Sequence, residues 1–373
     1  MQKISALFVV SFFYFLATAQ FKVIAEGPVF EEPETGFNKI LQLKSGYTAF
    51  IHITYKDGID LKIYDPAHTQ KVVKHIEPAY GKLKSGSIEG IFEINGDLTL
   101  MISEVDSKIP VLYRLIIDGK TGNLKEEKKI AELKRLSLGQ GYAALFGNVP
   151  IPDFFIRKDP YSDNYALAMF NSFASDKNKR IEIVHYGSDH KEISRAYYSS
   201  PDNKYKYMNY LDMTVIGKEK VSVLAFAYNT AASGGKESEL VLANLDQGAK
   251  EVTLHELRFS QDKIIDYGIT RYNPVSKKVI LLATARINKR GSTYETMIAY
   301  IDPFSNKLES VIAPYPKQAS EKSIELFGRK ASYTGMPQNL FINNDGSFSI
   351  VYEEITVISS EHLIVTVLGN IAV

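Results

Sequence analysis

The segment HYGSDH brings two imidazoles and a carboxylate close together in the chain, at His185, Asp189 and His190. Imidazole nitrogens and carboxylate oxygens are ligands that zinc accepts. The Gly-Ser-Asp sequence between them is also typical of a turn at the end of a strand. Neither a His-Glu-x-x-His motif nor an EF-hand loop occurs in the chain. We therefore predict no metal site.

The segment GQGYAA, residues 139–144, matches the spacing of a dinucleotide-binding turn. That turn needs a preceding parallel strand and a following helix, but Pro150 and Pro152 follow too soon for a helix of useful length. The chain has no Gly-x-Ser-x-Gly elbow, so the local geometry of an α/β-hydrolase serine nucleophile is missing. It also has no cysteine and therefore no thiolate nucleophile. Asp159 and Asp163, in DPYSDN, are interpreted as turn formers. We predict no cofactor and assign no catalytic residue.

A tyrosine-rich and lysine-rich segment, YYSSPDNKYKYMNY, is the most distinctive candidate for a contact surface. Tyrosine combines a broad apolar ring with a polar tip and few rotatable bonds, which suits binding. The alternative is that these rings pack between neighbouring sheets, because burial is the commoner use of aromatic side chains. The candidate ligand or partner surface comprises Tyr197, Tyr198, Lys204, Tyr205, Lys206, Tyr207 and Tyr210.

The elements that would position these residues form a repeating pattern of hairpins. In NLFINNDGSFSIVYEEI, residues 339–355, an apolar run and an alternating run flank a polar turn. Five similar segments precede it, and each joins two β-rich runs through Gly, Asn, Asp or Pro. They begin at Asn38, Glu89, Asp153, Leu211 and Gly268.

A third β-rich run follows each hairpin, and five of the six units continue into a fourth. A repeat of about 60 residues with four short strands is typical of a propeller blade, whereas solenoid repeats are shorter. A β-sandwich does not require the same strand order six times. The pattern over Asn38–Asn370, including the strand endings YDP and IDGKTG, resembles six-bladed propellers built from NHL-type and related repeats. This resemblance implies an all-β, six-bladed propeller with four-stranded blades and identifies no activity.

The sixth unit ends after its third run, whereas the β-rich run FKVIAEGPVF near the N-terminus has no place in the first unit. We predict that Phe21–Glu26 pairs with Leu363–Leu368 and closes the ring, which protects an open sheet edge. The alternative is a chain that has lost a C-terminal segment, which could include a further blade.

The first residues have the pattern of a secretory signal: Lys3, a mainly apolar segment from Ala6 to Ala17, and Ala17-Thr18-Ala19 as the cleavage motif. A membrane anchor would need about 20 apolar residues. We predict a signal peptide over residues 1–19 and a single propeller domain over residues 20–373. The mature chain is then periplasmic, cell-surface or extracellular, without a transmembrane segment, and the absence of glycosylation sequons favours a bacterial envelope.

Charge further limits the partners. Loss of Lys3 with the leader balances the 44 basic residues against the 43 acidic ones, so no overall field favours nucleic acid. Function in a propeller commonly lies on loops, and the long segments here connect successive units. We predict an exported, non-catalytic propeller that binds a protein or glycan through its inter-blade loops. The alternative is a hydrolase or lyase acting on extracellular sugar or peptide at the central channel.

Overall fold

The structure is a computed structural model that describes residues 33–54, 57–78, 86–135, 137, 139, 149–198, 205–229, 238–258, 264–286, 294–312, 321–322, 324–326, 328, 335–359 and 364–372. These residues form six antiparallel sheets, five of four strands and one of three, so the predicted six-bladed β-propeller is confirmed. The predicted signal peptide, the predicted strand Phe21–Glu26 and nearly all of GQGYAA lie outside the described residues.

Each blade consists of strands that follow one another in the sequence. Blade 1 contains β1 (Phe37–Gln42), β2 (Thr48–Thr54), β3 (Gly58–Tyr64) and β4 (Gln70–Ile76). Blade 2 contains β5 (Ser87–Ile94), β6 (Asp97–Asp106), β7 (Ile109–Asp118) and β8 (Leu124–Glu132). Blade 3 contains β9 (Asp153–Lys158), β10 (Tyr165–Phe170), a 3-10 turn η1 (Lys177–Lys179), β11 (Ile181–Tyr186) and β12 (Glu192–Tyr197).

The second half of the chain continues the pattern. Blade 4 contains β13 (Tyr207–Ile216), β14 (Lys220–Tyr228), β15 (Ser238–Asp246) and β16 (Thr253–Glu256). Blade 5 contains β17 (Ile264–Asn273), β18 (Lys278–Arg286), β19 (Tyr294–Ile301) and β20 (Leu308–Ile312). Blade 6 contains β21 (Met336–Ile342), β22 (Phe348–Ser359) and β23 (Ile364–Ala372).

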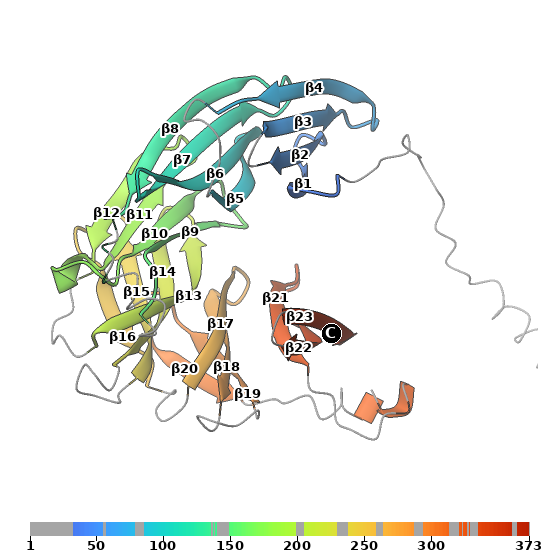
Figure 1. The fold of residues 1–373 in the computed structure, drawn as a ribbon. Helices are drawn as coiled ribbons and strands as arrows, with labels where there is room; N and C mark the ends of the chain where they lie inside the picture. Colours follow the sequence, from blue (N-terminus) through green and yellow to red (C-terminus); the bar gives the residue numbers. More distant parts are fainter. Residues whose placement is uncertain are drawn as a thin grey trace, which may run out of the picture.

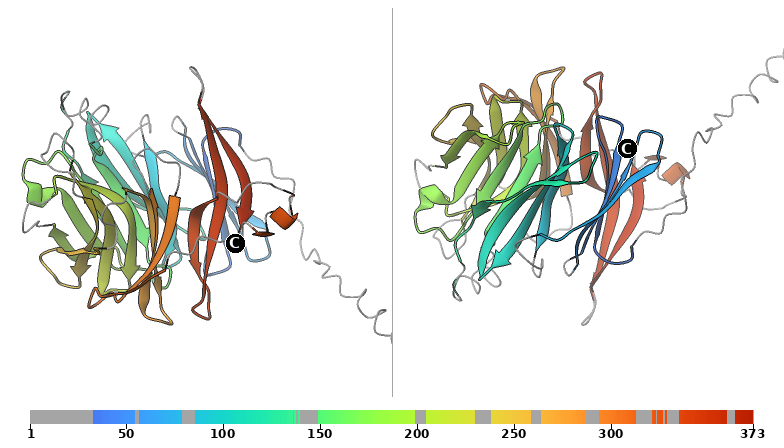
Figure 2. Two further views of the ribbon diagram at one scale, coloured as in Figure 1. Left: turned by 90° about the horizontal axis from the view of Figure 1, so that it is seen from below. Right: turned by 90° about the horizontal axis from the view of Figure 1, so that it is seen from above.

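The first strand of every blade lies on the inner side of the arrangement and the last strand lies outside (Figure 1). The strands of successive sheets run between the same two faces of the molecule (Figure 2). Each predicted hairpin is present, and its two strands pair in antiparallel register. In the hairpin of blade 6, Gly346 has φ +83°, a conformation that glycine adopts without the strain of a Cβ atom.

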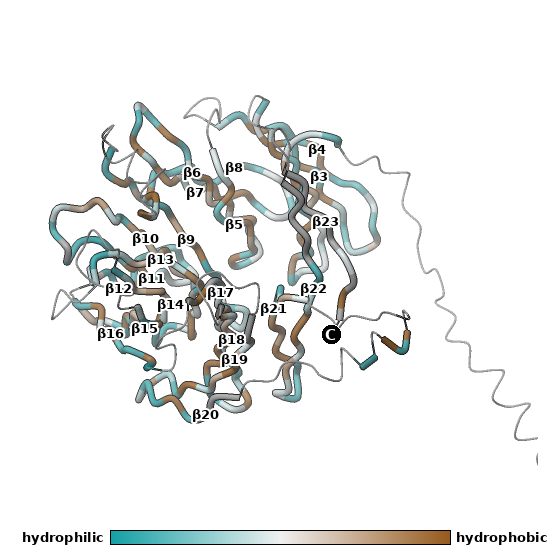
Figure 3. The backbone as a smooth tube through the Cα atoms, turned by 60° about the horizontal axis from the view of Figure 1, so that its bottom comes forward, coloured by the Kyte–Doolittle hydropathy of each residue, from teal (hydrophilic) through white to brown (hydrophobic). Residues whose placement is uncertain are grey.

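Apolar side chains fill the seams between successive blades. Separate buried clusters join blades 1 and 2, blades 2 and 3, blades 3 and 4, blades 4 and 5, and blades 5 and 6. Hydrophobic residues accordingly follow the strands, and many turns are hydrophilic (Figure 3). Between blades 3 and 4, Tyr198 and Val252 also form an isolated parallel bridge. The first five seams are therefore held by burial of apolar surface, which a chain without disulfides requires.

Two local features lie outside the repeated hairpins. The charged run LKEEKKIAE forms the outer strand β8, and its alternating charges protect a sheet edge. Helical residues occur at 321–322 and 324–326, in a short helical segment. Gly328 ends that segment with φ +63°, and its N–H donates to the carbonyl of Ile324 at 2.9 Å.

Candidate functional site

The inner strands β9, β13, β17 and β21 each contribute one polar residue to a connected group. We call this group the axial cluster; it comprises Arg157, Asp212, Arg271 and Asn339. These strands belong to blades 3, 4, 5 and 6 and follow one another along the inner side of the molecule (Figure 1). The repeat thus brings together side chains that are far apart in the sequence.

Bulges in the inner strands help to aim these side chains. The pairing of β13 with β14 shifts register between Tyr210 and Asp212, and that of β21 with β22 shifts between Pro337 and Asn339. A bulge inserts one residue and reverses the inward and outward alternation beyond it. Asp212 and Asn339 each come directly after such a bulge, so the irregularity places them in the cluster.

The carboxylate of Asp212 is the centre of the cluster. Its side chain is buried and accepts hydrogen bonds from Arg157 Nη2 at Oδ1 and from Arg271 Nη1 at Oδ2, the latter at 2.8 Å. The backbone N–H of Thr270 also donates to Oδ2, at 2.9 Å. With both oxygens occupied by donors, this carboxylate is an anchor for two guanidinium groups and is poorly suited to act as a base.

The two arginine side chains remain partly exposed, that of Arg157 by 38% and that of Arg271 by 21%. Arg157 also donates from Nε to the carbonyl of Met213, and Arg271 donates to the carbonyl of Thr270 and to Asn339 Oδ1. Within the described residues, these contacts leave Nη1 of Arg157 and Nε of Arg271 without an acceptor. The cluster therefore has spare hydrogen-bond donors on partly accessible cations.

Aromatic rings border the axial cluster. Tyr210 stacks on Phe155, with ring centroids 3.8 Å apart and planes 8° apart. Burial, and then the nearby charge of Asp212, raise the pKa of the Tyr210 hydroxyl, so this ring is neutral packing for the cluster. Tyr267 remains 38% exposed, and its hydroxyl donates to the carbonyl of Gln338 at 3.3 Å. A fixed, accessible ring therefore lies on β17 with Arg271.

Two carboxyl groups occupy the beginnings of the inner strands of blades 2 and 3. Glu89 is the bulge residue of β5, and Ser103 Oγ donates to its Oε1 at 2.7 Å. Burial raises the pKa of Glu89, and the charge of Asp153 on β9 raises it further. Burial also raises the pKa of Asp153. Carboxyl groups whose pKa is raised by burial are suited to take part in proton transfer.

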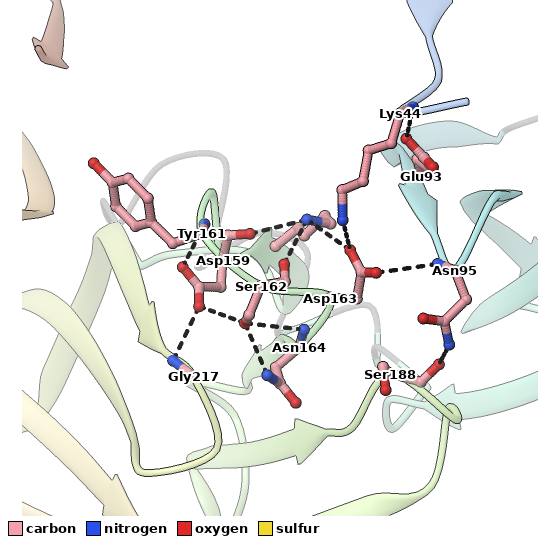
Figure 4. Close-up of polar contacts among 11 residues, drawn as sticks. Lys44, Glu93, Asn95, Asp159, Tyr161, Ser162, Asp163, Asn164, Ser188 and Gly217 are labelled. Carbon is pink, nitrogen blue, oxygen red and sulfur yellow. Dashed lines mark hydrogen bonds and ion pairs between the residues drawn. The ribbon is translucent and has the colours of Figure 1, made fainter. Parts of the chain in front are cut away.

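The turn between β9 and β10 ties blade 3 to three neighbouring blades (Figure 4). Asp159 accepts from the N–H of Tyr161 at 3.0 Å, from Ser162 Oγ, and from the N–H of Gly217 in blade 4 at 3.0 Å. Asp163 accepts from Lys44 Nζ in blade 1 and from the N–H of Asn95 in blade 2. The interpretation of Asp159 as a turn former is confirmed. The contacts of Asp159 and Asp163 stabilise the packing of blade 3 against blades 1, 2 and 4.

The tyrosine-rich and lysine-rich segment divides between the core and the surface. Tyr198 and Tyr205 are buried in the apolar cluster between blades 3 and 4, and Tyr210 packs against it. Tyr197 is 43% exposed at the end of β12, while Tyr207 and Lys206 are half-buried, with Lys206 Nζ 5.3 Å from the Tyr207 ring centre. Lys204 lies outside the described residues. The surface prediction therefore now concerns Tyr197, Lys206 and Tyr207.

The three possible metal ligands of HYGSDH each form hydrogen bonds with a different group. His185 is fully buried, and its Nε2 lies 3.0 Å from the carbonyl of Gly217. His190 Nδ1 lies 3.1 Å from the hydroxyl of Tyr165, whereas Asp189 caps its own turn through the N–H of Lys191. Within the described part of the chain, no group of three or more His, Asp or Glu side chains is arranged to hold a metal ion.

Comparisons with known proteins add little beyond the architecture. No protein-family model matches the chain. No curated protein matches it significantly. Among solved structures, a Synechocystis apocarotenoid oxygenase mutant is 10% identical over 85% of this chain, with a TM-score of 0.40, and the match spans 64% of that protein's length. The β-propeller domain of the Trilobed protease from Pyrococcus furiosus is 10% identical over 90% of this chain and 84% of that one, with a TM-score of 0.43.

A polysaccharide lyase, Uly1, is 9% identical over 85% of this chain and 74% of its own, with a TM-score of 0.44. At these levels of similarity no activity or ligand transfers to the present chain. The described helical residues include no segment long and apolar enough to span a membrane.

Proposed function

We propose that this chain is an exported, non-catalytic β-propeller that binds a protein or glycan, with the axial cluster as its principal contact. The observation that carries the proposal is the engagement of both Asp212 oxygens by donors from blades 3 and 5, beside arginine N–H groups that have no acceptor within the described residues. Such a group recognises a ligand through hydrogen bonds but offers no free base. The inter-blade segments, the exposed Tyr197 and the half-buried Lys206 and Tyr207 are proposed to extend the contact surface.

Export rests on the leader pattern in residues 1–19. If the leader is cleaved after Ala19, N-terminal sequencing of the protein recovered from a bacterial periplasm or medium will begin at Gln20. Recovery of an intact N-terminus in the cytoplasm would contradict export without affecting the proposal for the axial cluster.

Binding and catalysis are separated by one experiment on the mature chain. A panel of oligosaccharides and peptides is titrated by calorimetry, and the same mixtures are then analysed for products by chromatography. The proposal expects at least one ligand to bind, and the bound ligand to be recovered unchanged. Turnover of any panel member at a rate above the buffer control would overturn it.

A second candidate function, a hydrolase or lyase, is favoured by Glu89 and Asp153. Their pKa values are raised, and they lie on neighbouring inner strands, β5 and β9. General acid–base catalysis uses carboxyl groups tuned in this direction. If this function is correct, the variants E89Q and D153N will abolish turnover of the panel member that the wild-type chain consumes.

A further inference from the structure

The remaining hydrogen-bonding capacity of the axial cluster consists of donors. Both N–H groups on Nη1 of Arg157 and the Nε–H of Arg271 have no acceptor within the described residues. Asn339 Oδ1 accepts from Arg271 Nη2 at 3.1 Å and from the N–H of Leu340 at 2.9 Å, and its Nδ2 is another donor without an acceptor among the described residues. A ligand that fits this group must supply acceptor oxygens.

The charge of the cluster points in the same direction. Two guanidinium groups contact one carboxylate, that of Asp212. Arginine stays protonated at all physiological pH values. Arg157, Arg271 and Asp212 together therefore carry a net charge of +1. Because both side chains are partly exposed and both have N–H groups without an acceptor in the described residues, an incoming anion need not displace Asp212.

Asp212 also prepares the two arginines for binding. It fixes one edge of each guanidinium group, and the carbonyl groups of Met213 and Thr270 fix further N–H groups. The flexible arginine side chain loses conformational entropy when it is held in place. Here that loss occurs during folding, so a ligand gains more from each hydrogen bond.

From this arrangement we infer that the axial cluster binds the carboxylate of an acidic saccharide, between Arg157 and Arg271. This inference rests on the proposed function and specifies its ligand class. A carboxylate matches the planar guanidinium fork and forms charge-assisted hydrogen bonds with it. The ligand remains covalently unchanged, because the only carboxylate of the cluster, that of Asp212, already accepts three hydrogen bonds from the protein.

Tyr267 favours a saccharide over an acidic peptide as the carrier of that carboxylate. Tyr267 is 38% exposed, its hydroxyl donates to the Gln338 carbonyl, and the charges of Arg271 and Arg157 act on that hydroxyl, so a partly exposed and anchored ring lies near the two arginines. Binding sites commonly combine aromatic faces with a few placed polar groups. A uronic acid residue offers both parts, a ring that packs on Tyr267 and a carboxylate for the arginines.

The test uses the mature chain and three probes: tetragalacturonate, neutral cellotetraose and a tetra-aspartate peptide. Calorimetry is expected to detect tetragalacturonate alone, with affinity that decreases as salt concentration rises. The variant R157Q removes charge-assisted hydrogen bonds and should weaken tetragalacturonate binding at least about tenfold. The variant R157K keeps the positive charge but loses the planar guanidinium group. Its affinity for tetragalacturonate should therefore lie between those of the wild type and R157Q.

The matched control is R195Q. Arg195 lies on the outer strand β12, is 36% exposed and pairs with Glu182 and Glu192, so its replacement removes the same charge away from the axial cluster. It should leave tetragalacturonate affinity unchanged. Circular dichroism of each variant confirms folding, and if R157Q is unfolded, Y267A provides the second test, with affinity reduced at least about fivefold.

The outcomes separate this inference from the proposed function. Equal binding of cellotetraose, binding of tetra-aspartate in place of the saccharide, or full affinity in R157Q would overturn the ligand class while leaving a binding propeller. Consumption of tetragalacturonate would overturn the non-catalytic function while leaving the ligand class. Absence of binding to all three probes would overturn the inference.

Discussion

Lys44 Nζ lies 2.6 Å from Asp163 Oδ1, and this ion pair joins blade 1 to blade 3. Asn95 of blade 2 donates its backbone N–H to the other oxygen of the same carboxylate at 3.3 Å. Lys158, at the end of β9, lies 3.4 Å from Asp163 as well. One carboxylate thus connects turns of three successive blades on one face of the molecule.

The variant D163N should lower the free energy of unfolding by about 1–2 kcal/mol, because it removes charge-assisted hydrogen bonds with Lys44 and Asn95. Burial alone would raise the pKa of Asp163, but the hydrogen bonds from Lys44 and Asn95 outweigh it and lower the pKa. The contribution of ionised Asp163 to the free energy of unfolding is therefore present above the ordinary carboxyl pKa. It is lost as the pH falls through the lowered pKa of the folded state.

Urea denaturation between pH 7 and pH 3 measures this effect. The difference between wild type and D163N should shrink as the pH falls. The variant K44A should cost less, about 0.2–1 kcal/mol, because Lys44 is 63% exposed. A difference that stays constant down to pH 3 would show that the ionised form of Asp163 does not stabilise the fold.

Asp159 should be the most sensitive position in the turn of blade 3. The variant D159A leaves the N–H groups of Tyr161 and Gly217 and the hydroxyl of Ser162 without their acceptor. Because Asp159 is buried, we expect a loss of about 3 kcal/mol in the free energy of unfolding, measured by urea titration. The control S162A removes one donor and keeps the other two contacts. A loss in S162A equal to that in D159A would contradict the role given to Gly217.

Glu89 should show the opposite pH dependence from Asp163. Its folded-state pKa is raised by burial, so folding is favoured by protonation, and this contribution is fully present below the ordinary carboxyl pKa and lost as pH rises through the folded-state value. The variant E89Q should therefore be more stable than wild type at pH 7 and similar to it near pH 4. Thermal melts across that range measure the crossover. Equal stability of the two chains at pH 7 would show that the carboxylate of Glu89 is not destabilising.

The predicted closure of blade 6 by Phe21–Glu26 can be tested by disulfide trapping. The chain contains no cysteine, so each introduced pair reports alone. Cysteine at Val365 of β23 should crosslink with cysteine at Val23 or Ile24 if these strands pair, because paired strands bring Cβ atoms within disulfide distance. Gel mobility under oxidising conditions is the measurement. The control pairs Val23 with Val105, an exposed residue of blade 2. Crosslinking in the control alone would exclude closure by this segment.

The architecture was predictable because each hairpin carries its own local signal. Turn residues such as those at Asn343–Gly346 specify backbone conformations, and alternating runs specify strands, so six repetitions define six sheets. These features depend on residues adjacent in the sequence, which makes them readable without coordinates.

The axial cluster was missed because it depends on residues about one repeat apart. Arg157, Asp212 and Arg271 are single polar residues within strands and belong to no local motif. The bulge that redirects Asp212 has no mark in the sequence, since Leu211 is an ordinary strand residue. Aligned on their hairpins, the four residues of the cluster lie 1, 4, 2 and 3 positions before the ends of their inner strands, so the repeat itself does not mark them as a group.

The tyrosine-rich segment shows a second reason why the site could not be predicted fully from the sequence. Composition identified the rings, but the choice between packing and exposure depends on where neighbouring blades lie. Tyr198 and Tyr205 are within a few residues of exposed Tyr197 and half-buried Tyr207, yet they belong to the core. Alternating strand geometry and the seam between blades 3 and 4 decide the outcome, and neither can be derived from the segment alone.

The separate apolar clusters between successive blades imply that stability is transmitted from neighbour to neighbour along the chain, as in other repeat proteins. A substitution in one seam should then change amide hydrogen exchange most strongly in the two blades that share it. The axial cluster crosses several seams at once, through Arg157, Asp212 and Arg271. A ligand held by both arginines would therefore couple the opening of blades 3, 4 and 5, and their amides would become protected together.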